Sequence, residues 1–202
     1  MHVDLTQKTF SHETCFKIVL RRKWSRNKVK AAKWSTTLSP DHPLYVQLTD
    51  AYKDLGMCAA LVHKKLEFFD SISYSVQDGS ESACVRVNVG DIVSVPERRE
   101  GIAYAKVIAI IRHQTNEGRY FAFFLFQWFT RKHSEVLVDC PVYEIEEDPN
   151  SDEWRRLFPL NLVDHTSPVH FVHACRKGEC TREQHDPENR RYIRNEFFYH
   201  AV

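Results

Sequence analysis

Four residues have the side-chain types and the spacing of a structural zinc site. They follow the pattern His-x-Cys-x4-Cys-x4-His and are His173, Cys175, Cys180 and His185. Thiolate sulfur and imidazole nitrogen are favourable zinc ligands, and four protein ligands leave no open position for a catalytic water. The pattern therefore predicts a structural zinc ion and argues against a zinc-dependent hydrolase. The alternative is a β-hairpin in this segment, in which the cysteines are reduced and bind no metal.

A second group of residues has the charge to bind phosphate. Six basic side chains lie around Trp24, and they are Arg21, Arg22, Lys23, Arg26, Lys28 and Lys30. Such a cluster suits nucleic acid or nuclear import, whereas a solvated basic face or a disordered tail is the alternative. Residues 1–36 contain nine Lys and Arg against two acidic residues, but residues 139–153 contain seven acidic residues. Because the acidic stretch would repel a phosphate backbone, we do not expect a uniform DNA-binding surface.

Motifs that accompany catalysis are absent from the sequence. It has no glycine-rich phosphate loop, no Gly-x-Ser-x-Gly nucleophile elbow and no His-Glu-x-x-His motif. Eleven histidines are present, yet none lies in a motif that explains proton transfer. We therefore expect a binding module rather than an enzyme.

Length and composition indicate an intracellular globular protein. The chain has 202 residues, which suits one domain or one domain with an appended segment. No apolar run reaches the roughly 18 residues of a membrane helix, and the first residues lack a signal-peptide pattern. The six cysteines are mostly far apart, which indicates a reducing compartment rather than a disulfide framework. We expect no membrane partner.

The hydrophobic pattern predicts one short helix before the strands. Apolar residues recur at helical spacing from Leu44 to Leu55. Pro43 fits a first helical turn, and Gly56 can end the helix. We expect this amphipathic helix to cover a core, and partner binding is the alternative.

From residue 66 onward, apolar runs and turn residues predict antiparallel strands. In the run 66–76, four residues fall on one face by parity, namely Phe68, Ile72, Tyr74 and Val76. Asp78-Gly79 and Gly90-Asp91 predict turns. These closely spaced strands favour an antiparallel barrel or sandwich.

The longest apolar runs predict a central hairpin. Residues 102–112 and 120–130 flank a turn that contains Gly118, which is typical of a hairpin. The second run is apolar on both faces, so both faces should be covered. The expected core includes Phe68, Val87, Val93, Val107, Phe124 and Trp128.

Three segments resemble signatures of the bromo-adjacent homology family. They are a Val-Gly-Asp turn leading into an apolar strand at 89–95, the strand at 102–110, and a Trp-aromatic-x-Arg segment at 126–136. The resemblance implies a mainly β fold: a distorted antiparallel β-barrel with short helices, here with an N-terminal helical and basic extension. We expect a basic, partly disordered segment at 1–40, a helix and lead-in strand at 41–65, and the β domain at 66–202.

The same resemblance implies a nuclear, chromatin-associated module that binds a protein or peptide, such as a histone tail. Some family members hold a methylated lysine in an aromatic cage, where ring faces attract the cation. The matching candidates are Tyr104, Trp128 and Phe129, with Glu135 as a carboxylate partner; core packing is the alternative for the rings. The sequence is also similar to non-catalytic parts of fungal mobile-element proteins. The rival hypothesis is therefore a transposon-derived nucleic-acid binder that acts through the basic segment.

Overall fold

A computed structural model describes ten segments of the chain. They are residues 19–23, 43–57, 66–78, 81–97, 101–115, 118–137, 140–146, 156–163, 169–174 and 189–195. Within them, most residues lie in strands, and there is one α-helix. The elements are β1 (Val19–Lys23), α2 (Pro43–Asp54), β2 (Leu66–Asp78), β3 (Glu81–Asn88), β4 (Ile92–Glu97), β5 (Gly101–Gln114), β6 (Tyr120–Leu137), β7 (Cys140–Ile145), β8 (Leu157–Pro159), the 3-10 helix η1 (Leu160–Leu162), β9 (Phe171–His173) and β10 (Arg191–Arg194).

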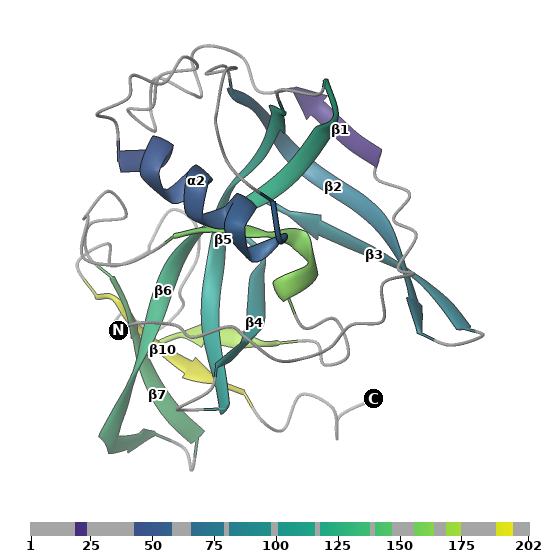
Figure 1. Cartoon of the computed structure of the whole chain (residues 1–202). Helices are drawn as coiled ribbons and strands as arrows, with labels where there is room; N and C mark the ends of the chain where they lie inside the picture. The colour runs from purple at the N-terminus through teal and green to yellow at the C-terminus, as the bar shows by residue number, and fades with distance from the viewer. Residues whose placement is uncertain are drawn as a thin grey trace.

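The predicted helix is present and covers part of the core. α2 begins at Pro43 and buries Leu44, Leu48, Ala51 and Tyr52 on one side. Gly56 follows the helix with a φ of 69°, a left-handed conformation that glycine adopts without steric cost. Figure 1 shows α2 lying across the face of β5 and β6. The expectation that it covers a core is confirmed, because its buried residues pack with β5 and β6.

β5 and β6 form the predicted central hairpin. They pair antiparallel from Tyr104 opposite Phe129 to Gln114 opposite Tyr120. Both faces of β6 are covered, as its apolar pattern predicted. Phe124 and Phe126 point into a main core, while Phe123 and Leu125 point into a helix-side core beneath α2.

The described strands belong to one antiparallel sheet. Its order is β1-β2-β5-β6-β7-β10-β9, with β3 beside β2, β4 beside β5 and β8 beside β6. The mainly β, antiparallel prediction is confirmed. The barrel prediction needs correction, because no pairing among the described strands joins the β1 end to the β9 end. The register shifts between Val107 and Ala109 in the β5–β6 pair, and between Arg131 and Val136 in the β6–β7 pair.

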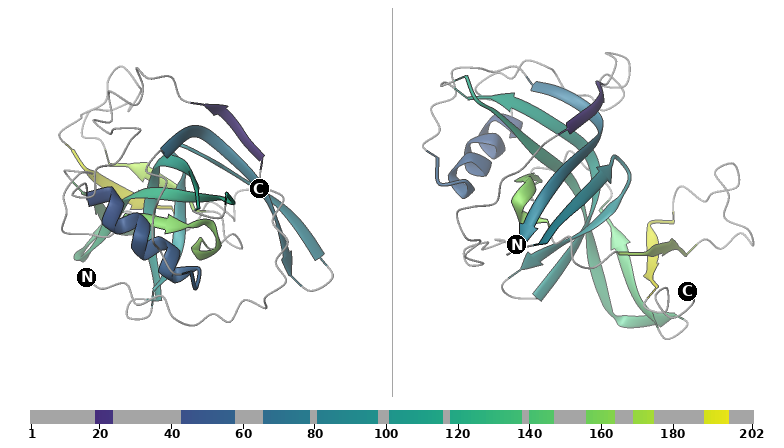
Figure 2. Two further views of the ribbon diagram at one scale, coloured as in Figure 1. Left: turned by 45° about the horizontal axis from the view of Figure 1, so that its top comes forward. Right: turned by 90° about the vertical axis from the view of Figure 1, so that its right-hand side faces the viewer.

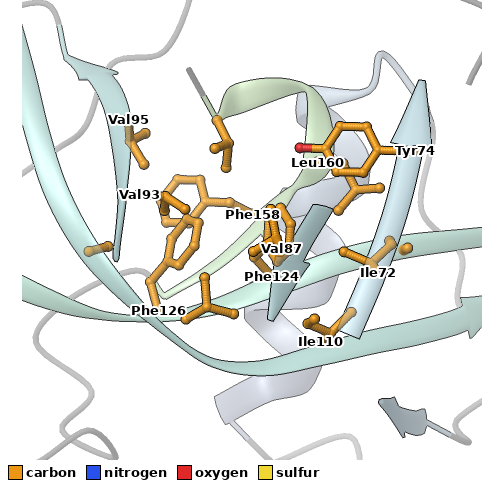
Figure 3. Close-up of a cluster of buried hydrophobic side chains, with 14 of the residues drawn as sticks. Ile72, Tyr74, Val87, Val93, Val95, Ile110, Phe124, Phe126, Phe158 and Leu160 are labelled. Atoms are coloured by element: carbon orange, nitrogen blue, oxygen red, sulfur yellow. The ribbon is translucent and has the colours of Figure 1, made fainter. Parts of the chain in front are cut away.

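The main core is formed by side chains of β2 to β6 together with those of β8, η1 and Val163. Figure 3 shows the side chains of Ile72, Val93, Phe124, Phe126, Phe158 and Leu160 converging there. All six residues expected in the core are buried, namely Phe68, Val87, Val93, Val107, Phe124 and Trp128. The parity prediction for β2 was wrong in one respect. Phe68 packs beneath α2, whereas Ile72 and Tyr74 face the main core, because this long strand pairs with β5 over its first residues and with β3 beyond Asp70.

Candidate functional site

A third cluster of buried and partly buried side chains is mostly aromatic. We call it the aromatic cluster, and its rings are Tyr104, Phe129, Tyr143, Phe171 and Tyr192. Ile145 is buried with them, and Ile92 and Val169 pack at its margin. The cluster joins β5 and β6 to β7, β9 and β10, and the right-hand view of Figure 2 shows these last three strands lying away from α2.

Strand register explains why these rings share one face. Tyr104 lies opposite Phe129 in the β5–β6 pair, and Tyr143 lies opposite Tyr192 in the β7–β10 pair. Directly paired residues of antiparallel strands project from the same face of the sheet. Phe171 enters from β9, which pairs with β10.

The rings contact one another in edge-to-face and stacked geometry. Phe171 is the centre: its ring lies 4.8 Å from Phe129, 5.1 Å from Tyr143 and 5.4 Å from Tyr104 between ring centres. Tyr192 meets Phe129 edge-on at 5.2 Å. Such pairs contribute about 0.5–1.5 kcal/mol each beyond the burial of their area. The cluster is therefore a small core in its own right.

A cation lies against this cluster. The guanidinium carbon of Arg194 is 5.0 Å from the centre of the Tyr104 ring. In the β9–β10 pair, Arg194 lies opposite Phe171, so that its side chain and Phe171 project from the same face. An arginine within about 6 Å of a ring centre is attracted by the negative face of the ring.

Ion pairs of Glu144 join β7 to β6 and to the residue just before β10, on the opposite face of the sheet. Glu144 of β7 binds Arg190 with an N–O distance of 3.1 Å, and it also binds Lys132 of β6. Two backbone hydrogen bonds of 2.9 Å lie at the ends of β10: Ile145 N donates to Arg190 O, and Asn195 N donates to His170 O. The backbone beside Arg194 is thus held on both sides.

The structure brings together two of the four predicted cage residues. Tyr104 and Phe129 meet in the aromatic cluster, but Trp128 points to the opposite face and packs on Phe126 and Phe158 in the main core. Consecutive residues of a strand alternate between faces, so that Trp128 and Phe129 do not line one site. Glu135 lies in β6, and its side chain falls outside the described part of the chain.

Three cluster rings were missed by sequence reasoning. Tyr143, Phe171 and Tyr192 come from strands of three to six residues, which are too short to show an alternation. One signal was available in the sequence: the neighbours Trp128 and Phe129 lie on opposite faces of a strand, so only one of them could belong to a cage.

Only His173 of the predicted zinc ligands is described. Its Nε2 donates a hydrogen bond to the carbonyl oxygen of Asn189, and its ring lies 5.0 Å from Tyr192. If Nε2 carries the proton, Nδ1 is the nitrogen with the chemistry of a metal ligand. Cys175, Cys180 and His185 lie outside the described residues. No group of three His, Cys, Asp or Glu suited to a metal occurs in the described segments, and the zinc site stays a prediction.

The basic segment is described only in part. Arg21, Arg22 and Lys23 belong to β1, which pairs with β2 at one end of the sheet. No strand was predicted here, and these three residues extend the sheet at its β2 side. Arg26, Lys28 and Lys30 lie outside the described residues.

Buried polar contacts elsewhere attach α2 to the sheet. The Tyr52 hydroxyl lies 2.7 Å from Nδ1 of the buried His113. The Gln47 side-chain oxygen accepts hydrogen bonds from the amides of Arg156 and Leu157 at 2.9 and 3.1 Å. Burial raises the pKa of the Tyr52 phenol well above its ordinary value. These groups stabilise the fold and do not form a site.

Comparisons with known proteins identify no family. No protein-family model matches the chain, and no curated protein matches it either. In the part of the chain that is described, no helix is long and apolar enough to cross a membrane. The aromatic cluster and its cation are therefore the basis for a functional hypothesis.

Proposed function

We propose that the chain is a non-enzymatic interaction module, which binds a cationic side chain of a protein or peptide partner at the aromatic cluster. The observation that carries this proposal is the guanidinium of Arg194, 5.0 Å from the Tyr104 ring centre. A cation is already accommodated against these rings, and desolvated cation–π contacts contribute about 2 kcal/mol. A methylated lysine or an arginine has the matching chemistry.

The motif resemblance to the bromo-adjacent homology family supports a more specific version. In that version the partner is chromatin, the ligand is a histone tail, and the protein acts in the nucleus. The open, curled sheet is then a variant of that family's distorted barrel. Tyr104 and Phe129 are the residues of the family-based prediction that the cluster contains.

Peptide binding by the full chain tests the proposal. Histone-tail peptides with unmodified and trimethylated lysine are titrated into the 15N-labelled protein and followed by NMR. We expect the trimethylated peptides to bind more tightly, because methylation makes the ammonium less strongly hydrated while it keeps its charge.

A pair of matched variants locates the binding site. Phe171→Leu keeps apolar volume in the cluster but removes the central ring, and it should weaken binding at least fivefold. Tyr120→Ala is the control, because Tyr120 is an exposed aromatic of β6 outside the cluster. Equal affinity of the two variants, or binding of peptides that lack any cationic side chain, would contradict the proposal.

We propose nucleic-acid binding as the second candidate, because β1 places three consecutive basic residues at one end of the sheet. A variant with Arg21, Arg22 and Lys23 replaced by Gln tests it without deleting the strand. If the segment binds phosphates, the affinity for double-stranded DNA falls, and the slope of log affinity against log salt decreases by roughly 0.9 for each lost contact. An unchanged slope would exclude a role for these side chains.

A further inference from the structure

Arg194 covers a ring that solvent hardly reaches. Tyr104 is only 4% exposed, whereas Arg194 is half-buried. The guanidinium lies over Tyr104, and Phe171 lies beside the same ring at 5.4 Å. A cation from a partner therefore finds the face of the Tyr104 ring already occupied by Arg194.

We propose that Arg194 is an internal ligand of the aromatic cluster, and that a partner's cation binds by replacing its guanidinium. The inference rests on the function proposed above and adds the regulation of that site. Two cations do not share one ring face, because their charges repel each other at this separation. Occupation by Arg194 and occupation by a partner are thus mutually exclusive.

The position of Arg194 in the strand allows this exchange without unfolding. It is the last residue of β10, and the next amide, Asn195 N, donates a 2.9 Å hydrogen bond to His170 O. The ion pair of Glu144 with Arg190 holds the residue just before the strand on β7, independently of Arg194. The exchange therefore needs movement of the Arg194 side chain and not separation of the strand.

Removal of the internal ligand should raise the affinity for an external cation. In Arg194→Gln the side chain keeps most of its length but loses its charge. We expect this variant to bind tetramethylammonium about tenfold more tightly than the wild type, a difference of about 1.4 kcal/mol. The matched control is Arg191→Gln, because Arg191 lies in the same strand opposite Glu144, on the other face. The control should bind like the wild type.

Binding is measured by titrating tetramethylammonium chloride into the 15N-labelled full chain, with sodium chloride titrated in parallel. Tighter binding by Arg194→Gln alone supports the inference. Equal affinity of Arg194→Gln and the wild type contradicts it but leaves the proposed function standing. If no protein binds the ion while all keep the wild-type circular dichroism spectrum, the cluster is not a cation site, and both proposals fail.

A measurement on the wild type decides the matter if Arg194→Gln does not fold. The Nε–H resonance of Arg194 should carry the ring-current shift of Tyr104. At saturating tetramethylammonium it should move to the position of a solvent-exposed arginine. A resonance that stays in place while cluster resonances shift would overturn the exchange.

Discussion

Gln47 of α2 is expected to be the most important polar residue for holding the helix on the sheet. Its side-chain oxygen accepts two backbone hydrogen bonds, from Arg156 N at 2.9 Å and Leu157 N at 3.1 Å. Both donors belong to residues that are at most 2% exposed. Gln47→Ala therefore leaves two backbone amides without their present acceptor at the start of β8.

The magnitude follows from the cost of unsatisfied buried donors. Each such amide costs about 1–3 kcal/mol, and partial access of water lowers the sum. The gain in helix propensity from Gln to Ala is only a few tenths of a kcal/mol. We expect Gln47→Ala to lower the free energy of unfolding by about 2–4 kcal/mol. Gln47→Glu should lose much less, because a carboxylate oxygen can accept the same two bonds.

Urea unfolding of the full chain, followed by tryptophan fluorescence, measures this loss. The control is Val46→Ala, one residue earlier in the same helix, where the side chain is 57% exposed. It should change stability by less than about 0.5 kcal/mol. The reasoning is refuted if Gln47→Ala is as stable as Val46→Ala at an unchanged slope of free energy against urea.

Three further predictions concern buried groups and the zinc pattern. Burial raises the pKa of Tyr52 and Tyr74, so the stability that their neutral phenols contribute is complete below the ordinary phenol pKa of about 10 and is lost as the pH rises above it. Absorbance at 295 nm should show these two phenols ionising together with the loss of circular dichroism. Ionisation of all tyrosines in a protein that stays folded would contradict this. Arg156→Leu removes the ion-pair partner of Glu146 and should lower the free energy of urea unfolding by about 3–5 kcal/mol. Replacing both residues by apolar ones should recover most of this loss. Elemental analysis should find one zinc ion per chain, with a lower melting temperature in chelator, if the 173–185 pattern binds metal; protein free of zinc and indifferent to chelator rejects the site.

Local sequence patterns predicted the elements with strong periodicity. The helix could be predicted because Leu44, Leu48 and Tyr52 repeat at its period between a proline and a glycine. The β5–β6 hairpin could be predicted because its two runs are long, apolar and joined by a glycine turn. In these elements, propensity, pattern and turn chemistry agree.

The rest depended on contacts between distant segments. β9 and β10 have three and four residues. β10 depends on pairing with β7, and β9 on pairing with β10, rather than on any local pattern. The basic run at Arg21–Lys23 indicated a phosphate-binding segment, a solvated face or a disordered tail, because its charge gives no strand pattern; the strand depends on pairing with β2. The open sheet was missed for a similar reason: turn signals predict antiparallel neighbours, but closure depends on how the two ends meet.

The aromatic cluster shows why a binding site and a core are hard to separate by sequence. Its rings pack on one another, and Arg194 lies over Tyr104, so this packing contributes to stability whether or not a ligand exists. An external cation must therefore replace an interaction that already stabilises the folded chain, and its observed affinity reflects only the difference between the two. Such a site is recognised by a residue whose removal raises the affinity for the ligand and lowers the stability of the fold. Arg194 is the residue at which the two effects can be measured in one variant, with opposite signs.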